Sequence, residues 1–184
     1  VLGRTPGNTV SDLSSSRGLR DVTEKHNSTY HAAAVGEVNV VTRMKEVDAV
    51  IGGEGNGGVI YPALHYGRDA LVGVALFLTL MARSGKSVSG IKASLPAYAI
   101  AKNKIQLTPD IDVDAILEAV KEKYSGEKIT DIDGVKIDFP TSWVHLRKSN
   151  TEPIIRIYSE APTMKEAEEL AESIKSVINE IKTC

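Results

Sequence analysis

The stretch from residue 52 to residue 58 reads Gly-Gly-Glu-Gly-Asn-Gly-Gly and holds five glycines in seven positions. Short apolar bursts flank it at 49–51 and 59–61, and their length and composition are typical of strands buried on both faces. The glycines let the intervening backbone take positive φ and approach a ligand closely. Two interpretations stay open here: a loop that faces a ligand, or a tight turn between two buried strands.

Helical and strand patterns alternate through the first half of the chain, which predicts an α/β layer architecture. Three segments show helical patterns, and a further segment suits a strand. The serines at 14–16 are expected to cap the first helix, and Asp69 the last. In chain order we expect a helix around 19–22, a strand over 30–35, a helix over 38–44 and a helix over 70–81.

The second half has a different pattern. Pro96 disfavours helix at the residue before it, and we place a boundary near 97–103, which gives domains 1–98 and 99–184. Strands grouped between two helices predict a small α+β domain with an antiparallel sheet covered by helices on one face, and Asp133-Gly134 is a strong hairpin signal. The expected strands are 104–107, 128–132, 135–139, 143–147 and 154–159, and the expected helices are 113–124 and 164–181.

Composition excludes several classes of protein. The 184 residues carry 22 Lys+Arg against 24 Asp+Glu and 42% hydrophobic residues, which indicates a globular chain without the basic excess of a nucleic-acid binder. The longest apolar run, 70–82, is too short to cross a bilayer, so we expect no membrane insertion. Cys184 is the only cysteine and cannot form an internal disulfide, which fits a reducing compartment. We therefore expect a cytoplasmic protein.

Glu54 and Asn56 are the only loop residues between 52 and 58 whose side chains can hydrogen-bond. A carboxylate and an amide two residues apart suit the binding of sugar hydroxyls. The loop lacks the terminal Gly-Lys-Ser/Thr of a phosphate-cradling P-loop. Downstream, Arg68 can meet a phosphate or carboxylate, while Asp69 is explained as a helix cap. His65 has no second metal ligand at suitable spacing, so we interpret it as a surface or packing residue.

The segment 147–153 reads Arg-Lys-Ser-Asn-Thr-Glu-Pro, with Arg156 after it. Two guanidinium groups flank small hydroxyl and amide side chains, and this combination suits an anion with several oxygens, above all a phosphate. The alternative is a polar hairpin turn with two solvated arginines. Glu152 would repel an anion, so we expect it to orient an arginine. The sequence shows no nucleophile beside a base, no paired carboxylates and no metal-ligand cluster, so we expect binding residues without a catalytic centre.

At residues 52–58 and 147–161 the chain resembles the α-D-phosphohexomutase superfamily. Members have four domains: the first supplies a phosphoserine, the second an Asp-rich loop that binds Mg²⁺, the third a Gly-Glu loop for the sugar and the fourth an Arg-Ser-Asn/Gly-Thr loop for the phosphate. The resemblance covers nearly the whole chain, but only as most of the third domain and the fourth. It implies that the missing N-terminal domains hold the phosphoserine and the Mg²⁺ ligands.

The resemblance also implies roles for individual residues. The Val35-Gly36-Glu37 stretch is similar to another family loop that faces the substrate. Many relatives have Ser at the place of Asn56 and His at that of Gly58, while Asn150 favours the mannose and glucose enzymes. The implied sugar-binding residues are Glu54, Asn56, Gly57, Glu37 and Arg68, and the implied phosphate-binding residues are Arg147, Ser149, Asn150, Thr151 and Arg156.

By this resemblance the full-length protein is an intramolecular phosphotransferase. It would interconvert hexose 1-phosphate and hexose 6-phosphate through a phosphoserine and a bisphosphate intermediate. The fragment alone is expected to be inactive. The alternatives are a phosphoglucosamine mutase and a module that binds sugar phosphates without catalysis.

Overall fold

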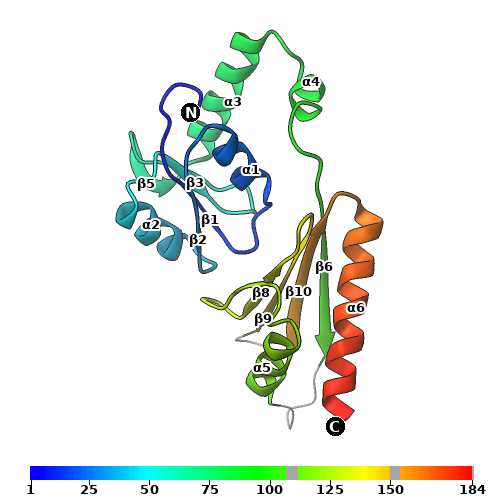
Figure 1. The fold of residues 1–184 in the computed structure, drawn as a ribbon. Coiled ribbons are helices and arrows are strands. Elements are labelled where there is room, and N and C mark those ends of the chain that lie inside the picture. The colour runs from blue at the N-terminus through cyan, green and yellow to red at the C-terminus, as the bar shows by residue number, and fades with distance from the viewer. Residues whose placement is uncertain (107–111, 150–153, 184) are drawn as a thin grey trace. The chain divides into compact units, whose positions relative to one another are not determined.

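The computed structural model describes residues 1–106, 112–149 and 154–183. The chain divides into two compact units, Val1–Ala97 and Tyr98–Cys184, called unit 1 and unit 2 below. Each unit contains one five-stranded sheet with helices packed on it (Figure 1). No helix in the described part of the chain combines the length and apolar character needed to cross a membrane.

The sheet of unit 1 is mixed, with the strand order β2-β1-β3-β4-β5. The interior strand β1 runs parallel to β2 and β3. The other two pairs, β3 with β4 and β4 with β5, are antiparallel. The strands are β1 (Thr9–Asp12), β2 (Tyr30–Ala33), β3 (Ile51–Gly53), β4 (Val59–Tyr61) and β5 (His65–Arg68).

The helices of unit 1 are α1 (Gly18–Lys25), α2 (Glu37–Glu46), α3 (Ala70–Ser84) and α4 (Val88–Lys92). Val10 of β1 is fully buried in a cluster with Val40 and Met44 of α2. The preceding residue, Thr9, instead forms a hydrogen bond with Thr23 of α1, and their Oγ1 atoms are 2.7 Å apart. Because successive residues of a strand point to opposite faces, α1 and α2 lie on opposite sides of the sheet. The α/β prediction for this half is therefore confirmed.

Three elements of unit 1 were not predicted, namely β1, β5 and α4. All four residues of β1, Thr-Val-Ser-Asp, are buried. Because three of them are polar, the sequence lacks the run of apolar residues that usually marks an interior strand. The cap predicted for the first helix was also wrong. Arg17 occupies the N-cap position without a side-chain cap, and Ser16 Oγ accepts only from the Gly18 backbone N–H at 3.1 Å. A hydroxyl caps a helix by accepting from the second or third helical N–H, which Ser16 does not reach.

Helix α3 is apolar on most of its surface. It begins as predicted, because Asp69 Oδ1 accepts from the Val72 backbone N–H at 3.0 Å. Several of its large side chains are nevertheless exposed, led by Leu71 at 80% and Val74 and Leu78 at 55%. A hollow of about 830 Å³ lies between α3, α1 and the first residues of the chain.

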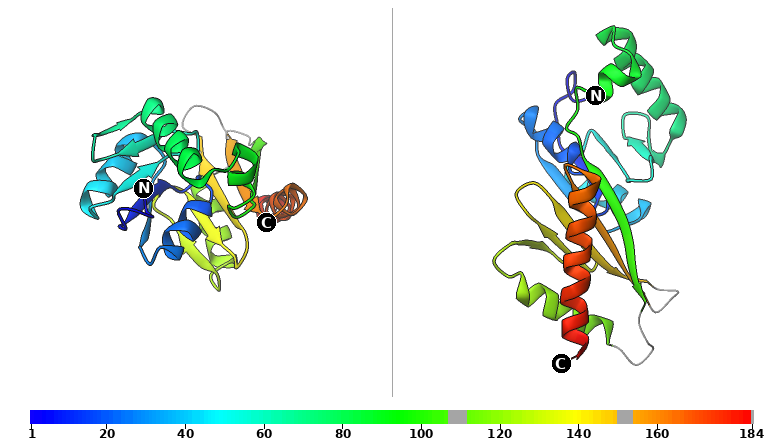
Figure 2. Two further views of the ribbon diagram at one scale, coloured as in Figure 1. Left: turned by 90° about the horizontal axis from the view of Figure 1, so that it is seen from above. Right: turned by 90° about the vertical axis from the view of Figure 1, so that its right-hand side faces the viewer.

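The sheet of unit 2 is fully antiparallel, with the order β6-β10-β9-β8-β7. Helix α6 runs beside β6 (Figure 2) and also contacts α5. The strands are β6 (Ala99–Gln106), β7 (Lys128–Thr130), β8 (Val135–Asp138), β9 (Trp143–Lys148) and β10 (Ile154–Ala161), and the helices are α5 (Val113–Lys123) and α6 (Met164–Thr183).

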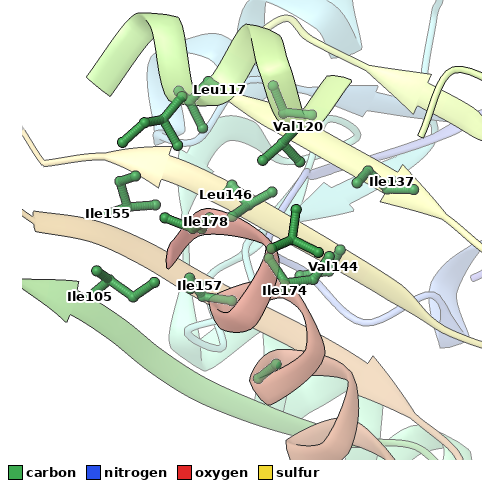
Figure 3. Packing of buried hydrophobic residues seen from close by; sticks show 14 residues of the cluster. Ile105, Leu117, Val120, Ile137, Val144, Leu146, Ile155, Ile157, Ile174 and Ile178 are labelled. Carbon is green, nitrogen blue, oxygen red and sulfur yellow. The ribbon is translucent and has the colours of Figure 1, made fainter. Parts of the chain in front are cut away.

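One hydrophobic core joins the sheet of unit 2 to both helices (Figure 3). Alternate residues of the strands point into it, for example Leu146 of β9 and Ile157 of β10, while Ile174 and Ile178 come from α6. Leu117 and Val120 of α5 complete the same cluster, so both helices cover one face of the sheet. The predicted α+β fold with helices on one face is confirmed.

Candidate functional site

The glycine-rich loop of unit 1 joins β3 to β4. Glu54 N–H donates to the Gly58 carbonyl at 2.9 Å, and Gly57 N–H donates to the Glu54 carbonyl at 3.0 Å. Gly57 has φ +93°, a conformation that side chains other than glycine rarely adopt. A Cβ on Gly53 would collide with the Gly58 carbonyl oxygen. The glycines thus permit a tight connection in which one side chain, Glu54, turns inward with only 6% of its surface exposed.

Glu54, Arg68 and Glu37 come together, although the sequence separates them by up to 31 positions. The Arg68 Nε donates to Glu37 Oε2 at 2.9 Å, and its backbone N–H donates to Glu37 Oε1 at 3.0 Å. Arg68 Nη1 lies 2.9 Å from Glu54 Oε2. That contact is an ion pair without hydrogen-bond alignment, since Glu54 Oε2 has no hydrogen-bond partner among the described residues. A buried carboxylate oxygen is therefore left to accept from a ligand.

The cluster of Glu37, Glu54 and Arg68 has more negative groups than positive ones. Two carboxylates face one guanidinium, and Arg68 is itself 45% exposed. The Arg68 backbone N–H, followed by the charge of its side chain, holds the pKa of Glu37 below its usual value. The cluster therefore carries an excess of one negative charge at neutral pH, which favours hydroxyl or ammonium groups over a second anion.

Gly58 determines where Arg68 can lie. A Cβ at position 58 would come within 2.6 Å of Arg68 Cδ and 3.0 Å of its Cγ. Asn56 Oδ1 accepts from the Gly58 backbone N–H at 3.0 Å, so the amide oxygen of Asn56 stabilises the loop. A hollow of about 500 Å³ adjoins the loop and is lined by Glu54, Ser11 and Ser15 among others.

His65 and Asp69 form a separate pair beside the loop. His65 Nε2 lies 3.0 Å from Asp69 Oδ2, and Nδ1 accepts from the Gly67 backbone N–H at 3.0 Å. The Val72 backbone N–H and then His65 lower the pKa of Asp69. Both His65 nitrogens thus have partners within unit 1. Across the described ranges, no three His, Cys, Asp or Glu side chains gather to hold a metal ion.

The second predicted loop joins β9 to β10 in unit 2. Ser149 N–H donates to the Ile154 carbonyl at 3.1 Å and closes the base of this connection. Ser149 is 9% exposed. The remaining predicted residues Asn150 and Thr151, together with Glu152, lie outside the described residues.

Three cations form a row across the sheet beside this loop. Arg147 of β9 is the cross-strand partner of Arg156 of β10, and Arg156 is the partner of Lys104 of β6. Directly opposed residues lie on the same face, where like charges destabilise a sheet. Arg156 and Lys104 are exposed. We call these three residues the cationic row, and its charge is best neutralised by an anion.

Lys104 was missed by the sequence analysis. The signal was present, because Lys102 and Lys104 alternate with the buried residues Ala101 and Ile105, as expected for a strand with one polar face. Only its register with Arg156 assigns it to the site, and register between distant strands is not readable from one sequence.

The carboxylate of Asp133 contacts Arg147. Asp133 Oδ1 accepts from Arg147 Nε at 3.1 Å. The sequence instead predicts that Glu152, which lies outside the described residues, orients an arginine. Asp133 was noted only as half of a hairpin turn.

Two family models match the chain. The family model described as "Phosphoglucomutase/phosphomannomutase, alpha/beta/alpha domain III" matches residues 2–98. The model described as "Phosphoglucomutase/phosphomannomutase, C-terminal domain" matches residues 101–177.

Two of the curated relatives are each 36% identical to the chain. The phosphoglucosamine/phosphogalactosamine mutase of Sulfurisphaera tokodaii is 36% identical over 171 residues, which cover 92% of this chain and 38% of the relative. The phosphoglucomutase/phosphomannomutase of Thermococcus kodakarensis is 36% identical over 163 residues, which cover 89% of this chain and 36% of the relative. The chain thus spans less than two fifths of the length of these relatives.

Solved structures show the same fold. A phosphoglucomutase/phosphomannomutase family protein from Burkholderia thailandensis superposes with a TM-score of 0.78 at 22% identity, covering 98% of this chain and 39% of that one. The two family models together match most residues of the chain. The chain therefore belongs to the phosphoglucomutase/phosphomannomutase family, and it contains that family's domain III followed by its C-terminal domain.

Proposed function

We propose that this chain supplies the sugar-binding and phosphate-binding parts of a phosphohexomutase, an enzyme that interconverts hexose 1-phosphate and hexose 6-phosphate. The observation that carries the proposal is the cationic row beside the β9–β10 loop. Arginine presents a planar pair of N–H donors that matches phosphate oxygens. The row would hold the phosphate that is not being transferred.

The carboxylates of unit 1 would bind the sugar. Glu54 keeps one buried oxygen without a hydrogen-bond partner in the described chain, and a sugar hydroxyl is a suitable donor for it. Glu37 and Arg68 would orient Glu54 and line the same site, with Asn56 and Gly57 shaping the loop. In this proposal the roles of Asn150 and Thr151 follow from the family motif alone.

The chemistry of phosphoryl transfer would come from other domains. The family resemblance assigns the Mg²⁺ ligands and the phosphoserine to domains outside this chain. Mg²⁺ would stabilise charge on the transferring phosphoryl group. The residues of this chain would position the substrate, which is a large part of catalysis in such reactions.

A glucosamine phosphate is the second candidate substrate. The excess negative charge of the Glu37, Glu54 and Arg68 cluster favours an ammonium group on the sugar. The name of the Sulfurisphaera tokodaii relative points the same way. A module that binds sugar phosphates without catalysis is the third candidate, and it would need no further domains.

An NMR titration of the chain with the 1-phosphates of glucose, mannose and glucosamine tests the proposal. We expect shared amide shifts around Arg147 and Arg156, and shifts near Glu54 that differ among the three sugars. The Glu54→Gln variant should lose the sugar-dependent shifts and keep the phosphate-dependent ones. Tighter binding of glucosamine 1-phosphate than of the neutral sugars would favour the second candidate.

Two results would contradict the proposal. The first is the absence of shifts at Arg147 and Arg156 with every ligand at millimolar concentration. The second is turnover of glucose 1-phosphate by the purified chain, since the proposal assigns the phosphoserine to another domain.

A further inference from the structure

The β7–β8 hairpin places a carboxylate beside the cationic row. Asp133, in this hairpin, accepts from Arg147 Nε at 3.1 Å, and the two side chains are 22% and 33% exposed. Asp133 is separated from Arg147 by 14 positions, so the contact depends on the pairing of β8 with β9.

The backbone of the hairpin is fixed against β9 on two sides. Gly134 has φ +73°, and a Cβ there would collide with the Leu146 carbonyl oxygen and lie 3.1 Å from Arg147 Cα. His145 Nε2 lies 2.7 Å from the Asp133 carbonyl oxygen, and since a carbonyl only accepts, Nε2 carries the proton. His145 is 2% exposed, and burial lowers its pKa to about 4, so the ring is neutral at neutral pH.

The contact uses one edge of the Arg147 guanidinium. Nε is engaged by Asp133, whereas Nη1 and Nη2 make no hydrogen bond to any described residue. A guanidinium binds a phosphate best through two parallel N–H groups. Fixing Nε leaves the terminal nitrogens available and reduces the rotamer freedom lost when an anion binds.

From this geometry we propose that Asp133 is a positioning residue for anion binding, acting through Arg147. The inference rests on the proposed function, because it assumes that Arg147 binds the phosphate. Asp133 is an anion near a site for anions, so simple electrostatics predicts that its removal strengthens phosphate binding, whereas a positioning role predicts that its removal weakens it.

The test is a titration of the chain with inorganic phosphate, comparing the wild type with Asp133→Asn. The variant keeps the shape and turn preference of Asp. It replaces the carboxylate by a neutral amide, whose oxygen can still accept a hydrogen bond but carries no charge. We expect about a three- to tenfold weaker affinity, because the hydrogen bond to Arg147 loses its charge assistance and this loss is partly offset by the relieved repulsion. The Arg147 Nε–H resonance should also lose the downfield shift and slowed exchange that a carboxylate partner produces.

Asp131→Asn is the matched control. Asp131 lies in the same hairpin and pairs with Lys121, 2.6 Å from its Nζ, so it carries the same charge without touching Arg147. This variant should leave phosphate affinity unchanged or slightly stronger. Far-UV circular dichroism verifies folding, and Asp133→Ser replaces Asp133→Asn if that variant fails to fold.

The outcomes separate the two proposals. If Asp133→Asn binds phosphate as tightly as Asp131→Asn or more tightly, while Arg147→Ala abolishes binding, the positioning role is wrong and the phosphate site stands. If Arg147→Ala has no effect, the proposed phosphate site fails and the positioning role fails with it.

Discussion

The two units bury apolar surface to different extents. Among the described residues, unit 2 places fourteen buried residues from six elements in one core, whereas the cluster under α2 in unit 1 has six residues. Unit 1 also leaves the apolar helix α3 exposed, with Leu71 at 80%. An exposed apolar helix face is unusual for a self-contained domain. Unit 2 therefore has the more complete core, and unit 1 the less complete one.

Core truncation should show this difference most strongly. We expect Ile157→Ala, at a fully buried position in β10, to lower the free energy of unfolding by about 2–5 kcal/mol, because it leaves a cavity. Leu71→Ala in α3 is the matched control and should change it by less than about 0.5 kcal/mol. Urea unfolding followed by circular dichroism measures both. Equal losses of unfolding free energy in the two variants would contradict the difference in burial between Ile157 and Leu71.

Acid should destabilise unit 2 through His145. Burial holds its pKa at about 4 rather than 6.5, so between these values the unfolded state binds a proton that the folded state does not. Stability therefore falls as the pH drops from 6.5 towards 4, by up to about 3 kcal/mol at 1.36 kcal/mol per pKa unit.

The fluorescence of Trp143, the single tryptophan, reports unit 2 during urea unfolding near pH 7 and near pH 4.5. His145→Gln should show a smaller loss on acidification than the wild type, which separates this histidine from the carboxylates. The same loss in both proteins would show that His145 titrates normally.

Two glycines with positive φ, Gly85 and Gly134, differ in how much stability an alanine substitution should cost. Gly85 ends α3 with φ +63° and open space around it, whereas Gly134 has φ +73° and faces β9. Gly85→Ala should cost about 1–2 kcal/mol from the left-handed conformation alone. Gly134→Ala should cost at least about 1 kcal/mol more, because its Cβ meets backbone atoms. Thermal unfolding of both variants gives the comparison, and a smaller loss for Gly134→Ala would be inconsistent with the tight hairpin.

Removing an exposed ion pair should change the stability of the protein least. Lys148 Nζ lies 2.8 Å from Asp114 Oδ2, with 50% and 72% of the two side chains exposed, and the pKa of Lys148 is raised by this hydrogen bond. Exposed pairs contribute little because water and salt screen them. Asp114→Asn should leave the unfolding midpoint within experimental error, and a clear decrease would show that this pair is stronger than its exposure implies.

Elements with strong periodicity could be predicted from the sequence. The stripe that includes Ile174 and Ile178 predicted α6, and Asp133-Gly134 predicted the β7–β8 hairpin, because both signals are local. Strand β1 was missed because Thr9 and Ser11 are buried as polar residues that hydrogen-bond to other elements. Local patterns do not show such partners.

The candidate site was predictable in its residue types but not in its contacts. Glu54 and Arg68 were singled out from the residues, and Glu37 through the family resemblance. The ion-pair network among them nevertheless joins the start of α2, the β3–β4 loop and β5, which are distant in the chain. The same holds for Lys104 and Asp133, whose relation to the arginines follows from strand register. Pairing across a sheet is set by the whole fold, so single-sequence reasoning could not reach it.

The measurement that tests the account most directly is calorimetric binding of inorganic phosphate at low salt. It compares the wild type with Arg147→Ala, Arg156→Ala and the control Arg83→Ala, which removes an arginine from α3 in unit 1. The account predicts at least about tenfold weaker binding for the two variants of the cationic row, and unchanged binding for the control. Equal affinity in all four proteins would contradict it.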